Sequence, residues 1–421
     1  MNILVLCPHF APDVAPTGEV MTSIVTELAA RGHRLHLVTA LPWYRSHAIE
    51  PGWEGRLVRH ETTPWGRITR VNPFPTDKRN IPARALAFGG WTAVSTVEGV
   101  LSRIAPDVVL AMSPPLPIGL AGWGVAQLRR VPFVFNIQDV FPDVAVELGL
   151  LTGAKVIRAA STLERFSYRR ADAVTVLSDD LAANVRAKLA RGGGTRPGGP
   201  GDPAKVHVIP NFVDTERIQP ADPDNAYRAE HGLTGKQVVM YAGNVGLSQS
   251  LDLVLAAARS LADDPSVVFV INGGGTARPD LERAAAGLAN VRFVDMQPRE
   301  RLPEVLAAGD VHVVPLKAGL AKASVPSKLY SILAAGRPIV ASVDPGTEVA
   351  TTVERAGAGA SVPPDDPEAF TDAIRRMLAD PERARAQGAA GRAWVLGWAS
   401  PAAVAEAYEA LFSSLVACRT S

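Results

Sequence analysis

The segment VPSKLYSILAAGRP, residues 325–338, carries a cation where helix electrostatics disfavours one. Its apolar run from Leu329 to Ala335 predicts a buried helix, which Gly336-Arg337-Pro338 would end. Lys328 then lies in the first turn, where the helix dipole already supplies about half a positive charge and a lysine costs about 0.3–1 kcal/mol. An anion bound there would turn this cost into an attraction. We therefore predict that Lys328 meets an anion, and the rest of the chain suggests a diphosphate.

Two glycine turns follow predicted strands in the second half of the chain. Gly243-Asn244-Val245-Gly246 lies between a strand at 237–243 and a helix at 250–262. Small residues let the backbone approach a ligand there, and exposed N–H groups favour phosphate. Gly273 lies in a second such turn, INGGGT at 271–276. A plain turn that binds nothing remains the alternative for both, and for Gly273 it is the preferred one.

Polar residues also follow two predicted strands in the first half. Gln138 and Asp139 end the strand at 133–137, where parallel sheets place acid/base or hydroxyl-binding groups. A solvated carboxylate that caps the next helix is the alternative for Asp139. Thr17-Gly18 precedes a helix expected near Val20 and either offers N–H groups to an anion or merely caps and turns. We assign His9, which ends the first strand, a packing or loop role.

Composition and missing motifs exclude several classes of protein. With 421 residues, 47% hydrophobic and 20% charged, the chain is typical of a soluble protein of two domains. A net charge of +1 argues against nucleic-acid binding. Cys7 and Cys418 form neither a disulfide framework nor a metal cluster, which suits a reducing cytosol. The sequence contains no dinucleotide fingerprint, Walker lysine, HExxH, paired Cys-x-x-Cys or G-x-S-x-G.

Neither of two apolar stretches is expected to be a targeting or membrane segment. The N-terminus MNILVLCPHF lacks the basic leader and apolar length of a signal peptide. Residues 108–128 are uncharged over membrane-spanning length, but Pro114, Pro115 and Pro117 would interrupt a helix. We expect a buried strand at 108–112, a loop, and a helix at 116–128.

Short apolar runs alternate with helical stretches in both halves, which predicts parallel α/β units. The expected strands are 2–8, 34–40, 108–112, 133–137 and 173–178, then 237–243, 267–273, 291–296, 311–316 and 338–342. We predict two doubly wound, Rossmann-like domains facing a central cleft, residues 1–205 and 206–400. A Gly- and Pro-rich loop at 191–205 precedes the boundary, and the helix at about 400–417 could pack on either domain.

Motifs along nearly the whole chain resemble one family. These are ILV…P…G…ELAARGH…VTA…P.Y at 3–44, IQD at 137–139, IPN.VD at 209–214, YAGN.G at 241–246, QP at 297–298 and VPSKLY.ILAAGRP at 325–338. Their order and spacing are similar to those of retaining GT-B glycosyltransferases of family 4. The branch they most resemble builds capsule, colanic-acid and O-antigen sugars on lipid carriers.

The resemblance implies roles by position. Gly18 would approach the donor phosphates, while Gln138 and Asp139 would face the anomeric carbon from the acceptor side. The implied donor residues are Gly243, Asn244, Val245, Gly246, Gln249 and Gly273 around the diphosphate, Gln297 and Pro298 at the nucleotide base, and Ser327, Lys328, Leu329 and Ser331 at the helix start.

Two departures from the family pattern concern the donor. Ala323 and Ser331 occupy the places of its paired glutamates, so the contact to ribose and the identity of the donor stay open. Asn244 and Gln249 replace an arginine and a lysine that usually hold the diphosphate. Lys328 would then be the principal positive charge left for it.

The implied reaction moves a sugar from a nucleotide-diphosphate donor, expected to be UDP-linked, to a hydroxyl with retention of configuration. Lys328 would stabilise the departing diphosphate, Asp139 would orient or deprotonate the acceptor, and no metal or cofactor would be needed. A nucleotide-sugar epimerase of the same fold is the first alternative. A non-catalytic nucleotide-sugar-binding protein is another, and an NAD enzyme is disfavoured by the absent fingerprint.

A lipid-linked acceptor would bring this cytoplasmic protein to the inner face of the membrane. Between residues 41 and 105 basic residues outnumber acidic ones nine to five, and 155–170 adds five basic residues against Glu164. Aromatic residues accompany them, namely Trp43, Trp53, Trp65, Phe88 and Trp91. Contact with anionic lipid and a merely solvated basic face are the two interpretations.

Overall fold

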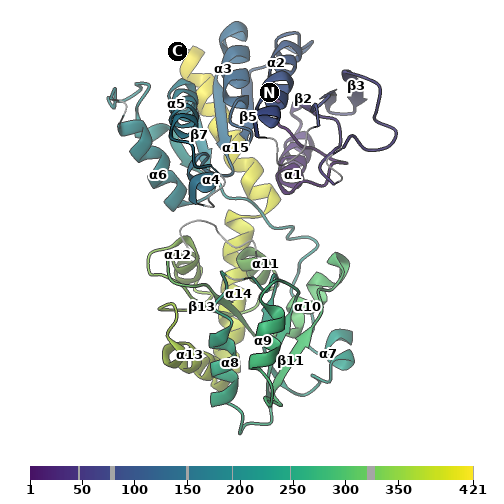
Figure 1. Ribbon diagram of the computed structural model, residues 1–421, viewed down its shortest axis with the longest axis vertical. Helices are drawn as coiled ribbons and strands as arrows, with labels where there is room; N and C mark the ends of the chain where they lie inside the picture. Colours follow the sequence, from purple (N-terminus) through teal and green to yellow (C-terminus); the bar gives the residue numbers. More distant parts are fainter. Residues whose placement is uncertain are drawn as a thin grey trace. The chain divides into compact units, whose positions relative to one another are not determined.

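The computed structural model describes residues 1–45, 48–75, 81–147, 151–191, 193–246, 248–319 and 328–420. The chain divides into two compact units, of which the first comprises 1–211 with 404–421 and the second 212–403. Each unit is built on a mainly parallel sheet flanked by helices (Figure 1). The α/β class predicted from the alternating apolar runs is therefore confirmed.

The first unit contains an eight-stranded sheet in the order β3-β4-β2-β1-β5-β6-β7-β8. Its strands are β1 (Asn2–Leu6), β2 (Arg34–Ala40), β3 (Val58–Thr63), β4 (Gly66–Val71), β5 (Val108–Ser113), β6 (Phe133–Ile137), β7 (Ala173–Val176) and β8 (Val206–Val208). All neighbours pair in parallel except β3 and β4. This edge hairpin was not predicted, because β3 is polar and only partly buried, so it gives no apolar run.

The first unit's helices follow the strands. They are α1 (Pro16–Ala30), α2 (Ile81–Val100), α3 (Ile118–Arg129), α4 (Asp143–Glu147), α5 (Ala154–Arg170) and α6 (Asp179–Ala190), and α15 (Pro401–Thr420) returns to this unit. The strand-loop-helix interpretation of 108–128 is confirmed by β5 and α3. The start expected near Val20 was wrong, because Pro16, whose fixed φ suits the first helical turn, begins α1.

A buried polar network joins the last helix to the first sheet. Asn136 in β6 is fully buried and donates to the Tyr408 hydroxyl at 2.8 Å and to Thr175 at 3.0 Å. The Asn136 carbonyl oxygen accepts from Gln138 at 2.8 Å. Because buried polar groups require partners, this network fixes the end of β6 where the predicted acceptor residues begin.

The second unit has a six-stranded, all-parallel sheet in the order β11-β10-β9-β12-β13-β14. Its strands are β9 (Gln237–Ala242), β10 (Val267–Asn272), β11 (Val291–Val294), β12 (Val311–Pro315), β13 (Ile339–Ser342) and β14 (Gly359–Val362). Its helices are α7 (Ala226–Glu230), α8 (Asp252–Ser260), α9 (Arg278–Ala284), α10 (Leu302–Ala308), α11 (Lys328–Ala334), α12 (Glu348–Arg355), α13 (Pro367–Ala379) and α14 (Pro381–Trp398).

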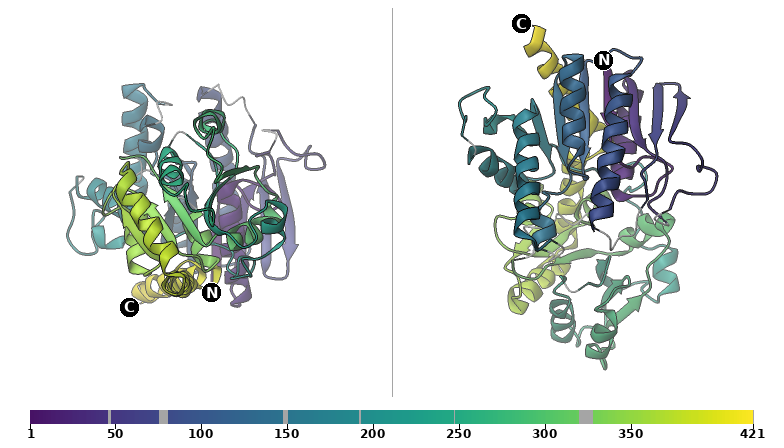
Figure 2. Two further views of the ribbon diagram at one scale, coloured as in Figure 1. Left: turned by 90° about the horizontal axis from the view of Figure 1, so that it is seen from below. Right: turned by 45° about the horizontal axis from the view of Figure 1, so that its top comes forward.

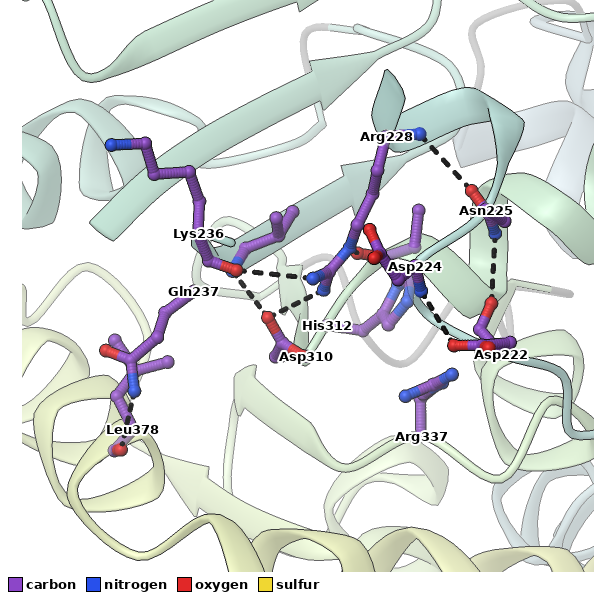
Figure 3. A network of polar contacts seen from close by, with 12 residues as sticks. Asp222, Asp224, Asn225, Arg228, Lys236, Gln237, Asp310, His312, Arg337 and Leu378 are labelled. Carbon is purple, nitrogen blue, oxygen red and sulfur yellow. Dashed lines mark hydrogen bonds and ion pairs between the residues drawn. The ribbon is translucent and has the colours of Figure 1, made fainter. Parts of the chain in front are cut away.

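An ion pair holds the amino ends of the central strands of this sheet (Figure 3). Arg228 of α7 reaches Asp310, the residue before β12, at 2.7 Å. The same carboxylate oxygen of Asp310 accepts from the Val238 N–H of β9 at 2.7 Å. Arg228 is 5% exposed and also donates to the Ala308 and Lys236 carbonyls. The pair therefore ties α7 to both strands.

Asp310→Ala should destabilise the second unit by about 3 kcal/mol, because a buried guanidinium loses its anion and the Val238 N–H loses its acceptor. Asp280→Ala is the matched control. It removes the carboxylate of a pair with Arg283 that is more than three-quarters exposed on both sides, and it should cost under about 1 kcal/mol. Thermal denaturation of both variants measures the difference, and equal losses would contradict the structural role of Asp310.

Candidate functional site

Two glycine loops pack together at the carboxyl edge of the second sheet. Gly243 follows β9 and Gly273 follows the neighbouring β10, with φ angles of 148° and 151°. A Cβ on Gly273 would overlap the carbonyl oxygen of Gly243, so only glycine permits this approach. Gly243 donates its N–H to Asn272 and Val245 donates its N–H to Gly274. Those two N–H groups are therefore not free for a phosphate, which corrects the expectation that the whole loop exposes its donors.

The ammonium of Lys328, the first residue of α11, reaches this loop. It donates to the Tyr241 hydroxyl at 2.9 Å and to Gln249 Oε1 at 2.7 Å. It lies 4.3 Å from the centre of the Tyr241 ring, and a Cβ on Gly243 would be 3.7 Å from it. Tyr241 in turn donates to the Asn244 carbonyl at 2.6 Å. The structure thus brings Lys328, Gly243, Asn244 and Gln249 together, and their common role at a diphosphate stays a prediction.

Tyr241 itself is a contact that the sequence did not assign, although it opens the YAGN motif. Its ring lies on a fully buried strand position and only its hydroxyl reaches the loop. Burial raises its pKa, which keeps it a neutral phenol. A tyrosine inside an apolar strand gives no sequence signal that separates packing from function.

The charge on Lys328 has no anionic partner among the residues that the structure describes. Its acceptors are a phenol and an amide, and burial lowers its pKa to about 7. Burial without a counterion disfavours the charged form, and an anion placed beside the ammonium would restore it. The site therefore suits an anionic ligand, and the strongly shifted pKa is typical of functional sites.

The other predicted donor residues lie at or near the same edge. Gln297 and Pro298 follow β11, with Gln297 donating to the Asp295 carbonyl and accepting from Arg301. The Leu329 side chain is fully buried in the core, so only its backbone could meet a ligand. Ser331 is partly buried, whereas Ser327 lies outside the described residues. Their roles at the donor stay predictions.

In the first unit, α1 packs closely against the loop after β1. A Cβ on Gly18 would be 2.9 Å from His9 Cβ, so this contact requires glycine. The Gly18 carbonyl accepts from Thr22 Oγ1 at 2.7 Å, and the same oxygen of Thr22 accepts from the Ala11 N–H. Thr17 lies inside the first helical turn and does not cap it, because the N-cap residue is Ala15.

The same loop contains a histidine–carboxylate pair. His9 Nδ1 lies 2.6 Å from Asp13 Oδ2, and the other oxygen of Asp13 accepts from the Tyr44 N–H at 3.0 Å. The imidazole stacks on Trp43 at a ring distance of 5.8 Å and meets the edge of Tyr44 at 5.3 Å. The packing or loop role predicted for His9 therefore does not account for its hydrogen bond to Asp13. Sequence reasoning missed the pair because spacing within an irregular, proline-containing loop does not show which side chains meet.

Gln138 and Asp139 differ in their surroundings. Gln138 is 6% exposed, donates to Asn136 and accepts from Asn211 at 2.9 Å. Asp139 is exposed, although partial desolvation raises the pKa of its carboxyl. Gln138 therefore holds the loop in place, and the carboxylate beside it remains accessible to a substrate.

Within the described ranges, no group of three or more His, Cys, Asp or Glu side chains is arranged to hold a metal ion. The donor set that the structure offers instead consists of one ammonium with amide and hydroxyl groups around it.

Comparisons with known proteins match both units. The family described as Glycosyl transferase 4-like domain matches residues 17–211, and that described as Glycosyl transferases group 1 matches 236–380. WcaI of Escherichia coli (strain K12), named as a colanic acid biosynthesis glycosyl transferase, is 30% identical over 91% of this chain and 93% of its own length. A GDP-mannose-dependent phosphatidylinositol monomannoside mannosyltransferase of Mycolicibacterium smegmatis is 31% identical over 94% of each protein.

Solved structures share the fold. WaaG, a glycosyltransferase involved in lipopolysaccharide biosynthesis, has a TM-score of 0.61 at 16% identity, covering 96% of this chain and 99% of its own. Anabaena HepE in complex with UDP has a TM-score of 0.65 at 15% identity, covering 99% and 100%.

Replacing Lys328 should change how stability depends on pH. Its pKa is 10.5 in the unfolded chain and about 7 in the folded protein, so the unfolded state binds more protons between these values. The stability of the wild type relative to Lys328→Met should therefore rise as the pH increases from 7 to 10. Thermal midpoints of both proteins across this range provide the measurement, with Lys236→Met as the control. A constant difference would show that Lys328 titrates normally.

Proposed function

The chain belongs to the group 1 glycosyl transferases of the GT-B fold, and from this premise we propose that it moves a sugar from a nucleotide-diphosphate donor to a hydroxyl with retention of configuration. The difficult step is departure of the diphosphate from an electron-poor anomeric carbon. A fixed cation beside the departing group lowers that barrier most, because it does not have to reorganise during the reaction.

The observation that carries the proposal is the buried ammonium of Lys328 beside the Gly243 loop. An ammonium has three N–H donors, and Tyr241 and Gln249 occupy two of them. The third has no acceptor among the described residues, and a diphosphate oxygen would supply both the acceptor and the missing negative charge. Gln249 occupies a place where the family pattern has a second cation, and its amide oxygen instead holds the Lys328 ammonium in position.

The remaining site residues take the roles that their family resemblance implies. Gly18 approaches the phosphates, Gln297 and Pro298 hold the base, and Ser331 lies where the family places its ribose-binding glutamate. Asp139, accessible at the end of β6, orients the acceptor hydroxyl. The reaction requires no metal or cofactor if these groups compensate the phosphate charge.

Names of relatives support a cell-surface saccharide as acceptor. They include proteins for colanic acid and for a phosphatidylinositol mannoside, and WaaG acts in lipopolysaccharide synthesis. We infer a lipid-linked saccharide acceptor. For the donor we keep a UDP-sugar as the expectation, with GDP-mannose as the comparison because the M. smegmatis relative depends on it.

A surface of the first unit fits contact with an anionic membrane. Helix α3 packs against α2 on one side and against α5 on the other, and α2 and α3 lie side by side in Figure 2. Leu120 and Leu128 of α3 are 39% and 69% exposed, and Arg170 of α5 lies over the rings of Trp123 and Phe166. Exposed apolar residues beside arginine–aromatic pairs are typical of an interfacial surface. No described helix is both long and apolar enough to cross a bilayer.

Lys328→Met should reduce sugar transfer by about 10²–10³-fold and weaken donor binding, because the diphosphate loses its fixed cation. Lys236→Met, which removes an ammonium at the amino end of β9, should leave both unchanged. Transfer is measured with lipid-linked saccharide acceptors, and binding by thermal shift with UDP- and GDP-sugars.

Three results would contradict the proposal in different ways. Full activity of Lys328→Met would show that the diphosphate does not bind at this site. Conversion of the donor without any acceptor would indicate an epimerase. Donor binding without transfer to any acceptor would indicate a nucleotide-sugar-binding protein.

The protein should sediment with vesicles containing anionic lipid at low salt and less so at high salt. Leu120→Ser with Leu128→Ser should weaken this binding, because apolar area is lost from the surface. Leu396→Ser, a change at a 43% exposed leucine of the second unit, is the control. Absence of vesicle binding by the wild type would leave only a solvated basic face.

A further inference from the structure

The His9–Asp13 pair has the geometry of a proton acceptor held by a carboxylate. Asp13 is 3% exposed, and both its oxygens are engaged, one by the Tyr44 N–H and one by His9 Nδ1. An ionised carboxylate only accepts hydrogen bonds, so the ring atom facing it must be Nδ1–H. The neutral imidazole then carries its lone pair on Nε2.

The ring is fixed in place and its Nε2 edge is left available. Trp43 lies against one face, Tyr44 meets it edge-on, and the Cβ of His9 packs on Gly18 of α1. The His9 side chain keeps 13% exposure, and its Nε2 makes no hydrogen bond with any described residue. A histidine with only a packing role does not require a buried carboxylate to select its tautomer.

The pair also lies where a substrate is expected. His9 follows β1 and Asp139 follows β6, with β5 between them in the parallel sheet, so both loops leave the same carboxyl edge. Strands about 4.8 Å apart place the carboxyl ends of β1 and β6, from which these loops leave, about 10 Å from each other. Ligands of such sheets bind at this edge, and aromatic rings with a few fixed polar groups are typical of their pockets. Trp43 and Tyr44 supply those rings.

We propose that His9 Nε2 accepts the proton of the acceptor hydroxyl and that Asp13 is the positioning residue for His9, an inference that rests on the proposed glycosyl transfer. The hydroxyl proton passes to Nε2, and the hydroxyl oxygen bonds to the anomeric carbon on the same face from which the diphosphate leaves, as retention of configuration requires. The bond from that carbon to the diphosphate oxygen breaks, and its electron pair stays on the diphosphate. Asp13 stabilises the imidazolium, which returns its proton to water before the next turnover.

His9 and Asp139, both at the carboxyl edge of the first sheet, have different roles. Asp139 is exposed and its carboxylate makes no hydrogen bond with a described residue, so no described group holds it in one orientation. His9 is held on three sides and by one carboxylate. His9 therefore transfers the proton, and Asp139 contributes a hydrogen bond that orients the acceptor sugar.

Two substitutions test the proposal. His9→Gln should lower kcat by about 10²–10³-fold, the usual contribution of a positioned base, while donor affinity stays unchanged. Asp13→Asn should act similarly. The Tyr44 N–H can still donate to the new amide oxygen, so the amide nitrogen faces His9 and donates to its Nδ1. The ring proton of the neutral imidazole is then on Nε2, which can no longer accept the hydroxyl proton. The control Thr22→Val loosens the same loop by removing the bond to the Ala11 N–H but leaves the pair intact, and it should keep its kcat.

A spectroscopic measurement on the wild type does not depend on how the variants fold. The ¹⁵N shifts of His9, identified by the signal absent from His9→Gln, should show the Nδ1–H tautomer in the wild type and the Nε2–H tautomer in Asp13→Asn. An Nε2–H tautomer in the wild type would overturn the proposal. So would a kcat of His9→Gln within about threefold of the wild type. Failure of the wild type itself to bind donor or transfer sugar would instead contradict the proposed function.

Discussion

The ammonium of Lys328, buried against neutral oxygens, is the constraint on which the second unit's site depends. Its partners are the Tyr241 hydroxyl and the Gln249 amide, and burial brings its pKa down to about 7. A cation kept without a counterion is an unfavourable element of a free protein. The buried cation becomes favourable only when an anion binds beside it. Gly243 and Gly273, which pack closely and carry no side chains, leave space next to the Lys328 ammonium.

The first unit solves a different problem, which is to hold neutral and acidic groups in fixed orientations at a sheet edge. Buried hydrogen bonds from Asn136 through Gln138 to Asn211 fix the loop after β6, and Tyr408 of α15 anchors that network. Asp13 does the same for the loop after β1. Satisfied polar networks of this kind rigidify a structure at little cost in stability, because no buried group is left without a partner.

Sequence reasoning succeeded where one periodic signal dominated. Fully apolar runs located the central strands. The charge of Lys328, which opposes the helix dipole, indicated an anion site at the start of its helix. It failed where contacts decide the structure. The polar hairpin β3–β4, the hydroxyl of Tyr241 and the pairing of His9 with Asp13 depend on residues that meet only in the folded chain. The acceptors of the Gly243 and Val245 N–H groups lie 29 residues away, at the end of β10 and in the turn after it, so the sequence does not show that these donors are occupied.

If a diphosphate supplies the charge that Lys328 lacks, the protein takes up a proton when the donor binds, and this uptake is the most direct measurement. Both phosphates of a nucleotide-sugar are already ionised at pH 8, whereas Lys328, with a pKa of about 7, is mostly neutral there. Calorimetry in buffers of different ionisation enthalpy should show uptake of nearly one proton per nucleotide-sugar bound, and none for Lys328→Met. Binding by the wild type without proton uptake would contradict the account.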